Sequence, residues 1–165
     1  MFFIRTAMSS DLPIVQNLIL DSWNKTYCSI YGKTEAKKIA ERKFSTAGLA
    51  QQLDRPNSEF LVADNGTVVG GMAYAEQSVA GIELKQIFVD PAYQSGKTGI
   101  HLLIEIENSF MDATKIQLEI EKQNDKAIQF FRNYGFSVAN EFTNVDQDMP
   151  NIEMLRLEKT IEYAD

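Results

Sequence analysis

Cysteine and histidine are nearly missing from this chain, which has Cys28 and His101 and no other residue of either type among its 165. A single cysteine excludes an internal disulfide and a cysteine-rich zinc site. A single histidine excludes a metal site with two histidine ligands. Cys28 is predicted to be a small buried hydrophobe, His101 is predicted to pack or to face solvent, and no metal is expected.

Long apolar runs and an excess of positive charge are also missing. No uninterrupted apolar stretch approaches the ~20 residues of a membrane-spanning helix, and the first residues, MFFIRTAMSSD, contain no signal-peptide core. The 16 Lys and Arg against 23 Asp and Glu give a formal net charge of -7, which argues against broad nucleic-acid binding. We therefore expect a cytoplasmic protein with neither a membrane nor a nucleic acid as its partner.

The composition that remains is that of one globular domain. The chain is 44% hydrophobic and 24% charged, which is ordinary for a folded protein. A chain of this length buries roughly two-thirds of its unfolded surface, so it needs no disulfide or structural metal. Because there is no repeat, low-complexity tract or convincing linker, residues 1–165 are predicted to form a single domain.

Local patterns predict a strand and then helices in the first third. Residues 2–7 read as a strand, and the first helix is predicted to begin with Ser9 or Ser10 as its N-cap and Pro13 in its first turn. Its buried side is predicted to carry Ile14, Val15, Leu18, Ile19 and Trp23. Two further helices are expected over residues 35–44 and 47–53.

After residue 58 the pattern becomes mostly extended. Strands are predicted over residues 59–63, 67–76 and 82–89, with Asp64-Asn65-Gly66 as the first hairpin turn. A helix over residues 98–111, a strand over 115–120, a helix over 125–134 and strands over 136–142 and 152–157 complete the chain. This order indicates a mixed α/β layer fold.

The turn Gly96-Lys97-Thr98, between a predicted strand and a predicted helix, spells the end of a nucleoside-triphosphate P-loop. That motif needs glycine five residues before Gly96, where this chain has Pro91. Proline has a fixed φ and no N–H to donate, so the P-loop is disfavoured. Two alternatives stay open: residues 95–99 bind another anion at the helix N-terminus with help from Lys97, or the turn binds no ligand.

The flanking residues resemble the GCN5-related N-acetyltransferases. The run ELKQIFVDPAYQ (residues 83–94) is similar to the family's fourth strand and the loop that follows it. In the pyrophosphate signature Gln/Arg-x-x-Gly-x-Gly/Ala, Gln94 fills the first place and Gly99 the last, whereas Lys97 stands at the first glycine. The run NDKAIQFFRNYGF (residues 124–136) resembles the family's Asn-x-x-Ala-x-x-Phe-Tyr-x-x-x-Gly-Phe segment, and SWNKTY (residues 22–27) resembles its first helix.

The resemblance implies a mixed, mostly antiparallel sheet of six to seven strands, flanked by helices and splayed between the fourth and fifth strands. It also implies acetyl-CoA as cosubstrate and no metal. The residues that it assigns to coenzyme A are Ile87, Phe88, Val89, Gln94, Ser95, Gly96, Lys97, Thr98, Gly99, Ile100, Asn124, Ala127, Phe130 and Phe131.

The implied reaction moves the acetyl group to a primary amine by direct attack in a ternary complex. It needs a neutral amine, a stabilised oxyanion and a proton for the thiolate. Glu83 is the candidate base; the alternative is a strand residue paired with Lys85 or a neighbouring segment. The family often has tyrosine where Phe131 stands, so the candidate acid is Tyr134, three residues on; water as the donor, or a merely packed Tyr134, stays open.

Trp23, Tyr27, Tyr74 and Glu76 are the candidate acceptor-site residues, although the aromatic residues of the first helix equally suit anchoring it to the sheet. Negative net charge and aromatic side chains favour a polyamine-like acceptor, beside amino-acid-like or peptide amines. Family analogy predicts a possible homodimer. The alternative function is a CoA-binding regulatory module with little turnover, which Phe131 and Lys97 motivate.

Overall fold

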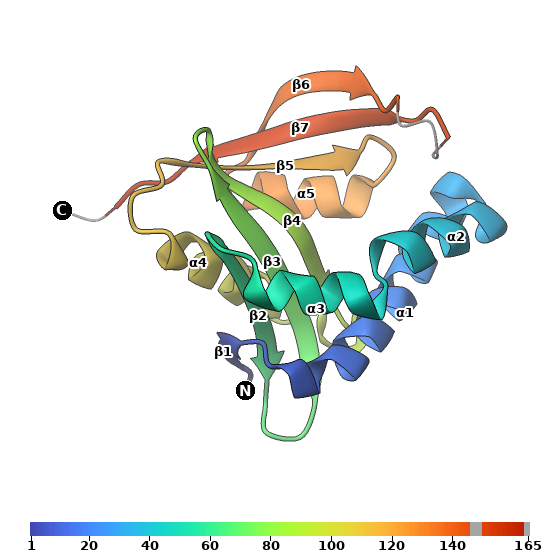
Figure 1. Ribbon diagram of the computed structural model, residues 1–165. Coiled ribbons are helices and arrows are strands. Elements are labelled where there is room, and N and C mark those ends of the chain that lie inside the picture. Colours follow the sequence, from blue (N-terminus) through green and yellow to red (C-terminus); the bar gives the residue numbers. More distant parts are fainter. Residues whose placement is uncertain (146–149, 164–165) are drawn as a thin grey trace.

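The computed structural model describes residues 1–145 and 150–163 (Figure 1). The helices are α1 (Leu12–Tyr31), α2 (Lys33–Lys43), α3 (Thr46–Asp54), α4 (Thr98–Ser109) and α5 (Asp125–Asn133). The strands are β1 (Phe3–Thr6), β2 (Ser58–Asp64), β3 (Val69–Ser78), β4 (Gly81–Val89), β5 (Lys115–Glu121), β6 (Ser137–Thr143) and β7 (Glu153–Thr160). The predicted elements are confirmed, with ends that differ by up to three residues.

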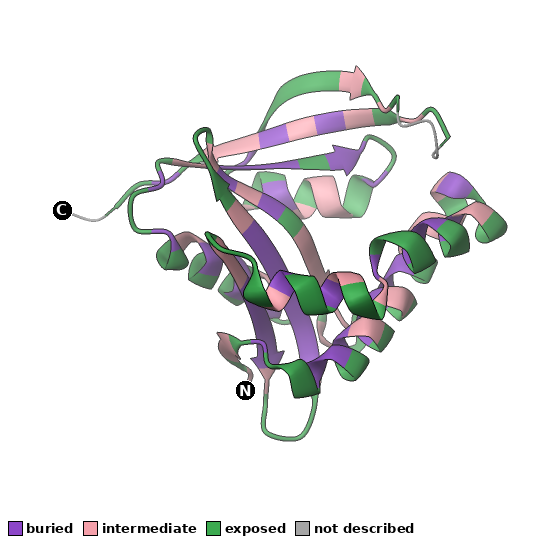
Figure 2. Ribbon diagram, viewed as in Figure 1, coloured by how far each residue is buried: buried purple, intermediate pink, exposed green. Residues whose placement is uncertain are grey.

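The strands form one sheet in the order β1-β2-β3-β4-β5-β7-β6, and every neighbouring pair is antiparallel except β4 and β5. Helices α1, α2 and α3 cover one face, and α4 and α5 cover the other (Figure 1). The central strands β2 and β3 are buried along most of their length, whereas the edge strand β6 is largely exposed (Figure 2). The predicted fold class is therefore confirmed.

Two cores lie on the two faces because successive strand residues point in opposite directions. In β2, Leu61 and Ala63 pack with α4 and α5, whereas Phe60 and Val62 pack with α1, α2 and α3. Half-buried Cys28 contacts the second core, and His101 faces solvent. The sheet thus lies between two layers of helices and contributes residues to both cores.

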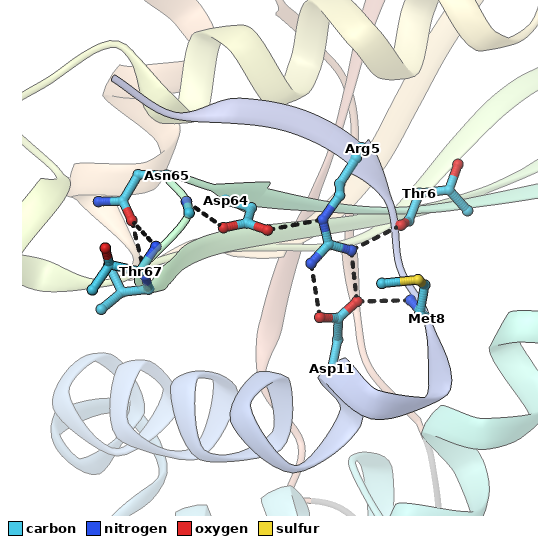
Figure 3. Close-up of polar contacts among 9 residues, drawn as sticks. Arg5, Thr6, Met8, Asp11, Asp64, Asn65 and Thr67 are labelled. Carbon is cyan, nitrogen blue, oxygen red and sulfur yellow. Dashed lines mark hydrogen bonds and ion pairs between the residues drawn. The ribbon is translucent and has the colours of Figure 1, made fainter.

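An ion-pair network fixes where α1 begins (Figure 3). Arg5 donates from Nη1 and Nη2 to the carboxylate of Asp11 at 2.8 and 2.9 Å and from Nε to Asp64 at 2.9 Å. The Met8 N–H also donates to Asp11, at 2.7 Å. The hydrogen bonds from Arg5 outweigh burial and hold the pKa of Asp11 below its usual value. The network joins β1, the start of α1 and the end of β2.

The predicted start and buried face of the first helix need two corrections. Neither Ser9 nor Ser10 is its N-cap, because a 3-10 turn spans Ser9–Asp11 and α1 begins at Leu12, with Asp11 in the N-cap position. Ile14 is 51% exposed and not part of the buried side, which passes through Val15 and Ile19. The first helix therefore begins later than predicted, after the 3-10 turn.

Strand β4 contains a β-bulge in its pairing with β3, close to where it leaves β5. Tyr74 pairs with Gln86 and Ala75 with Leu84, so Lys85 is one extra residue in β4. A bulge bends its strand, and within the described residues β4 pairs with β5 only at Ile82↔Ile116 and Glu83↔Gln117. Beyond Glu83 the two strands diverge (Figure 1), so the predicted opening between the fourth and fifth strands is present.

Candidate functional site

The turn between β4 and α4 presents free backbone donors at the open end of the two strands. No side chain caps the N-terminus of α4, where Lys97 occupies the N-cap position. The first N–H groups of a helix have no intrahelical acceptor, and together with the helix dipole they attract anions. The amides that follow Lys97 are therefore suited to a phosphate group.

Side chains hold the rest of this turn in place. Asp90 accepts a hydrogen bond from the Ala92 N–H at 2.8 Å. Gln94 donates to the Val89 carbonyl at 3.0 Å and accepts from Lys126 Nζ at 2.9 Å. Gln94 thus fixes the turn against β4, and Lys126 brings an ammonium group to the turn through Gln94.

The two glycines of this turn differ in how much space they need. A Cβ on Gly99 would lie 3.1 Å from the ring of Phe130, whereas a Cβ on Gly96 would meet only the Tyr93 carbonyl, at 3.5 Å. Lys97 has φ -96 and ψ 9, which non-glycine residues tolerate. Lysine at the family's first glycine position therefore causes no backbone strain, whereas a side chain at position 99 would press against the Phe130 ring.

The second matching segment forms one wall beside the turn. Asn124 caps α5 by accepting from the Ala127 N–H, at 3.4 Å, and Gly135 ends this helix with φ +108, as glycine allows. Half-buried Phe130 and Ala127 pack at the edge of the core. Phe131 is 3% exposed and lies inside that core, against Phe136.

The residues of β4 that follow the bulge contact both layers of helices. Ile87 and Val89 pack on the side of α4 and α5, and Phe88 packs on the opposite side, 5.7 Å from the ring of Phe44. Gln86 is held by Gln52 of α3 at 3.1 Å. Of the other predicted residues, Ser95 and Ile100 are exposed and Thr98 is buried.

Glu83 lies where β4 and β5 part. Its Oε2 accepts from Arg156 Nη2 at 3.1 Å, and its side chain is 17% exposed. Arg156 also binds Glu119, at 3.0 Å. Glu83 therefore pairs with Arg156 of β7, two strands away in the sheet, and not with Lys85. It shares a depression of about 320 Å³ with Glu76, Gln77, Ser78, Lys85, Gln117 and Arg156.

Tyr74 and Glu76 lie on the strand beside Glu83. The Tyr74 hydroxyl donates to Glu76 Oε2 at 2.8 Å, and Arg55 approaches the same oxygen at 3.4 Å. Burial and this carboxylate raise the pKa of Tyr74 to about 12. Tyr74 is almost fully buried, so Glu76 is the one of the two that lines the depression.

Tyr134 lies near the other end of α4 from the turn. Its hydroxyl donates to Glu107 Oε2 at 3.4 Å, and Lys159 Nζ lies 4.9 Å from its ring centroid. Burial, and then the charge of Glu107, raise the pKa of this phenol to about 12. The phenol is therefore protonated at neutral pH, and its described partner is a carboxylate on α4.

Three aromatic residues form a row along α1 at intervals of four residues. The rings of Trp23 and Tyr27 stack at 4.0 Å, and those of Tyr27 and Tyr31 are 6.0 Å apart. Trp23 donates to the Ala36 carbonyl at 2.8 Å and so anchors α2. Tyr27 accepts from Asn124 at 3.2 Å. The row thus joins the N-terminal helices to the end of β5.

Arg156 and Glu121 also belong to this region, although no sequence pattern indicated them as site residues. Glu121 is 6% exposed and accepts a hydrogen bond from Tyr31 at 2.8 Å. Arg156 and Glu119 are directly opposite in the β5–β7 register. Arg156 lies on a predicted strand and Glu121 directly follows one, and the sequence gives no further signal because their contacts depend on the sheet order.

No group of three or more His, Cys, Asp or Glu suited to a metal ion occurs within residues 1–145 and 150–163. In the same ranges, none of the helices has the length and apolar character required to span a membrane. The donors of the site are therefore amides, hydroxyls, carboxylates and cationic side chains.

Comparison with known proteins identifies the class that this fold and site define. The profile described as the acetyltransferase (GNAT) family matches residues 18–136. The chain is similar to a spermidine N(1)-acetyltransferase of Thermoplasma acidophilum, with 26% identity over 143 residues, 83% of this chain and 89% of the relative. It is 31% identical to the N-alpha-acetyltransferase RimI of Mycobacterium tuberculosis over 105 residues, 59% of this chain and 64% of that one.

The fold also matches a crystal structure of a PaiA N-acetyltransferase from Thermoplasma acidophilum in complex with coenzyme A. The TM-score is 0.83, at 23% identity over 98% of this chain and 99% of the other. The chain belongs to the acetyltransferase (GNAT) family. The predicted family and enzyme class, an acetyl-CoA-dependent N-acetyltransferase, are thereby confirmed.

Proposed function

We propose that the protein transfers the acetyl group of acetyl-CoA to a primary amine by direct attack in a ternary complex. The observation that carries the proposal is the bulge at Lys85, which opens β4 from β5 beside the uncapped N-terminus of α4. The amine nitrogen attacks the thioester carbonyl carbon, the C–S bond breaks, and the thiolate takes up a proton.

Coenzyme A is proposed to bind at the β4–α4 turn. Residues 95–100, with Gln94, are proposed to hold the pyrophosphate, mainly through the amides that follow Lys97, because a helix N-terminus without a side-chain cap favours an anion. The Gly96 N–H already donates to the Tyr93 carbonyl at 3.2 Å. Ile87, Phe88 and Val89 are proposed to offer backbone donors to the thioester oxygen. Asn124, Ala127, Phe130 and Phe131 are proposed to form and support the wall beside the pantetheine arm.

Glu83 is proposed as the base that removes the ammonium proton, directly or through water. Its support is the position at the parting of the strands and the depression that it lines. Arg156 orients the carboxylate through their ion pair. Tyr134 is proposed as the donor to the thiolate, with water as the alternative, because its phenol is protonated at neutral pH.

The acceptor is proposed to be a small polyamine-like amine, with Trp23, Tyr27, Tyr74 and Glu76 near its site. One relative is a spermidine acetyltransferase, and the aromatic row with neighbouring carboxylates suits an alkylammonium chain. Amino-acid-like and peptide amines are the other acceptor classes. We further propose a single domain over residues 1–165, while the cytoplasmic location and the homodimer stay predictions.

A CoA-binding module with little turnover is the second candidate. The burial of Phe131 at the family's tyrosine position favours it, because no phenol stands there. Thiol release from acetyl-CoA, measured across a panel of polyamines, amino acids and peptide N-termini, tests both. Amine-dependent release supports the enzyme; tight acetyl-CoA binding without release for any amine would leave the regulatory module.

A further inference from the structure

The end of β5 holds a carboxylate that the chemistry above does not use. Glu121 is 6% exposed, its carboxylate accepts a hydrogen bond from the neutral hydroxyl of Tyr31, and the Tyr27 hydroxyl also interacts with it. The adjacent Lys122 pairs with Glu141 and Glu153 instead. Taking a carboxylate out of water is costly unless a cation pairs with it.

No cation of the chain is left to pair with Glu121. Among the described residues, no Lys or Arg lies within ion-pair distance of it, whereas Glu76, Glu83 and Glu119 each have a basic partner. Residues 146–149 and 164–165, outside the described ranges, contain no Lys, Arg or His. Any cation that pairs with Glu121 therefore comes from outside this chain.

The surroundings of Glu121 suit an alkylammonium group. Tyr31 contacts its carboxylate, and the stacked rings of Tyr27 and Trp23 continue the aromatic row from Tyr31 along α1. Lys43 Nζ lies 5.7 Å from the Trp23 ring, so a cation already occupies the far end of this row. Aromatic faces beside a carboxylate bind cations through their quadrupole and through charge.

The position of Glu121 relates it to the reaction site. Gln117, Glu119 and Glu121 alternate onto one face of β5, and Arg156 joins Glu119 to Glu83 on that face. Gln117 pairs with Glu83 where the strands part. The four residues of strand from Gln117 to Glu121 cover about 13 Å. An extended alkyl chain of that length would reach from the proposed base to Glu121.

We infer that Glu121, with Tyr27 and Tyr31, binds the second ammonium group of a diamine or longer polyamine whose first amine is acetylated near Glu83. The inference rests on the proposed function and narrows its substrate to amines that carry a second positive charge at a distance. A monoamine fills the reaction end and leaves Glu121 without a cation.

The test compares Glu121→Gln with the wild type on matched ligands, an α,ω-diamine and the monoamine in which one amino group is replaced by methyl. Glutamine keeps the shape and the acceptor for Tyr31 but removes the charge. Calorimetry on the CoA-loaded protein measures binding, and thiol release measures turnover. Glu105→Gln is the control for net charge, because Glu105 is exposed on α4.

We expect the wild type to bind the diamine at least tenfold more tightly than the monoamine, and Glu121→Gln to lose that difference. Monoamine binding, acetyl-CoA affinity and the Glu105→Gln variant should change less than twofold. A series of diamines of increasing length should show the largest effect of Glu121→Gln at one length. This would locate the second ammonium group relative to the reacting one.

The outcomes separate this inference from the proposed function. Charge-selective diamine binding without turnover would support the Glu121 site and refute the enzyme. Acetylation of both amines with equal efficiency, unchanged in Glu121→Gln, would support the enzyme and refute the site. A lower melting temperature of Glu121→Gln with unaltered selectivity would make Glu121 a structural partner of Tyr31, and absence of diamine binding would refute the inference.

Discussion

The two faces of the sheet form their parts of the site in different ways. On the face of α4 and α5, the groups proposed for coenzyme A come from two short segments, the turn after β4 and the start of α5, and many of them are backbone amides. On the face of α1, α2 and α3 the groups are side chains from distant segments. Arg156 and Glu83 are 73 residues apart in sequence, and Tyr31 and Glu121 are 90 apart.

This difference predicts that the two faces respond differently to substitution. A binding site made of backbone amides is sensitive to larger side chains and to added negative charge. Substitution cannot remove the amides themselves, so it acts by blocking or repelling the ligand. A side-chain site is sensitive to loss of charge and tolerant of shape. Substitutions on the first face should therefore alter cofactor affinity, and those on the second should alter turnover or amine affinity.

Gly99→Asp should have the largest effect, abolishing detectable binding of coenzyme A. Its Cβ would meet the Phe130 ring at 3.1 Å, and its carboxylate would face the phosphates at the start of α4. Calorimetric titration with coenzyme A measures the effect, and circular dichroism checks the fold. Gly96→Asp is the matched control, since that position has room; it adds the same charge and should weaken binding only about tenfold. Wild-type affinity in Gly99→Asp would show that the cofactor binds elsewhere.

Glu83→Gln should lower kcat about 100-fold, within the usual range for loss of a general base, and leave coenzyme A affinity within twofold. Glutamine retains an acceptor for Arg156 but cannot take a proton. Steady-state kinetics over a pH series gives the measurement. Glu119→Gln removes a second carboxylate partner of Arg156, which also has Glu158 at 4.0 Å, and should cost less than threefold. Equal losses in both variants would assign the effect to the position of Arg156 and not to a base.

The same contrast explains which features were predictable from the sequence. Asn124 and Gly135 act through the backbone within a few residues of their own position, so their spacing reveals them. Glu121 and Arg156 have partners that the strand order alone brings near, and one-dimensional spacing carries no trace of that order. Asp11 replaced Ser9 and Ser10 at the start of α1 because Arg5, on the preceding strand, binds it. An ion pair between residues six positions apart overrode the capping preference of the two serines.

Asp11→Asn should destabilise the protein by about 2 kcal/mol at pH 7, as expected for hydrogen bonds to a charged group. Because Arg5 lowers the folded-state pKa of Asp11, its stabilising contribution is complete above the unfolded-state pKa of about 3.9. It is lost as the pH falls through the lower folded value. Urea unfolding at several pH values should show the gap between wild type and variant closing below pH 4. Exposed Asp21→Asn is the control, and a gap that persists in acid would contradict the role of the charge.

Tyr134→Phe should have the smallest effect, a fall in kcat of about threefold with coenzyme A affinity unchanged. A thiolate is a good leaving group because its conjugate acid has a pKa near 8.5 in model thiols, so water can protonate it when the phenol is absent. The hydroxyl is also bound to Glu107 rather than directed freely toward the opening. Burst and steady-state measurements of thiol release give the comparison, and the alkaline limb of the rate profile should persist in the variant. A loss of 100-fold or more would make the phenol the main proton donor, and would show that a residue of the α4 and α5 face controls turnover as strongly as Glu83 does.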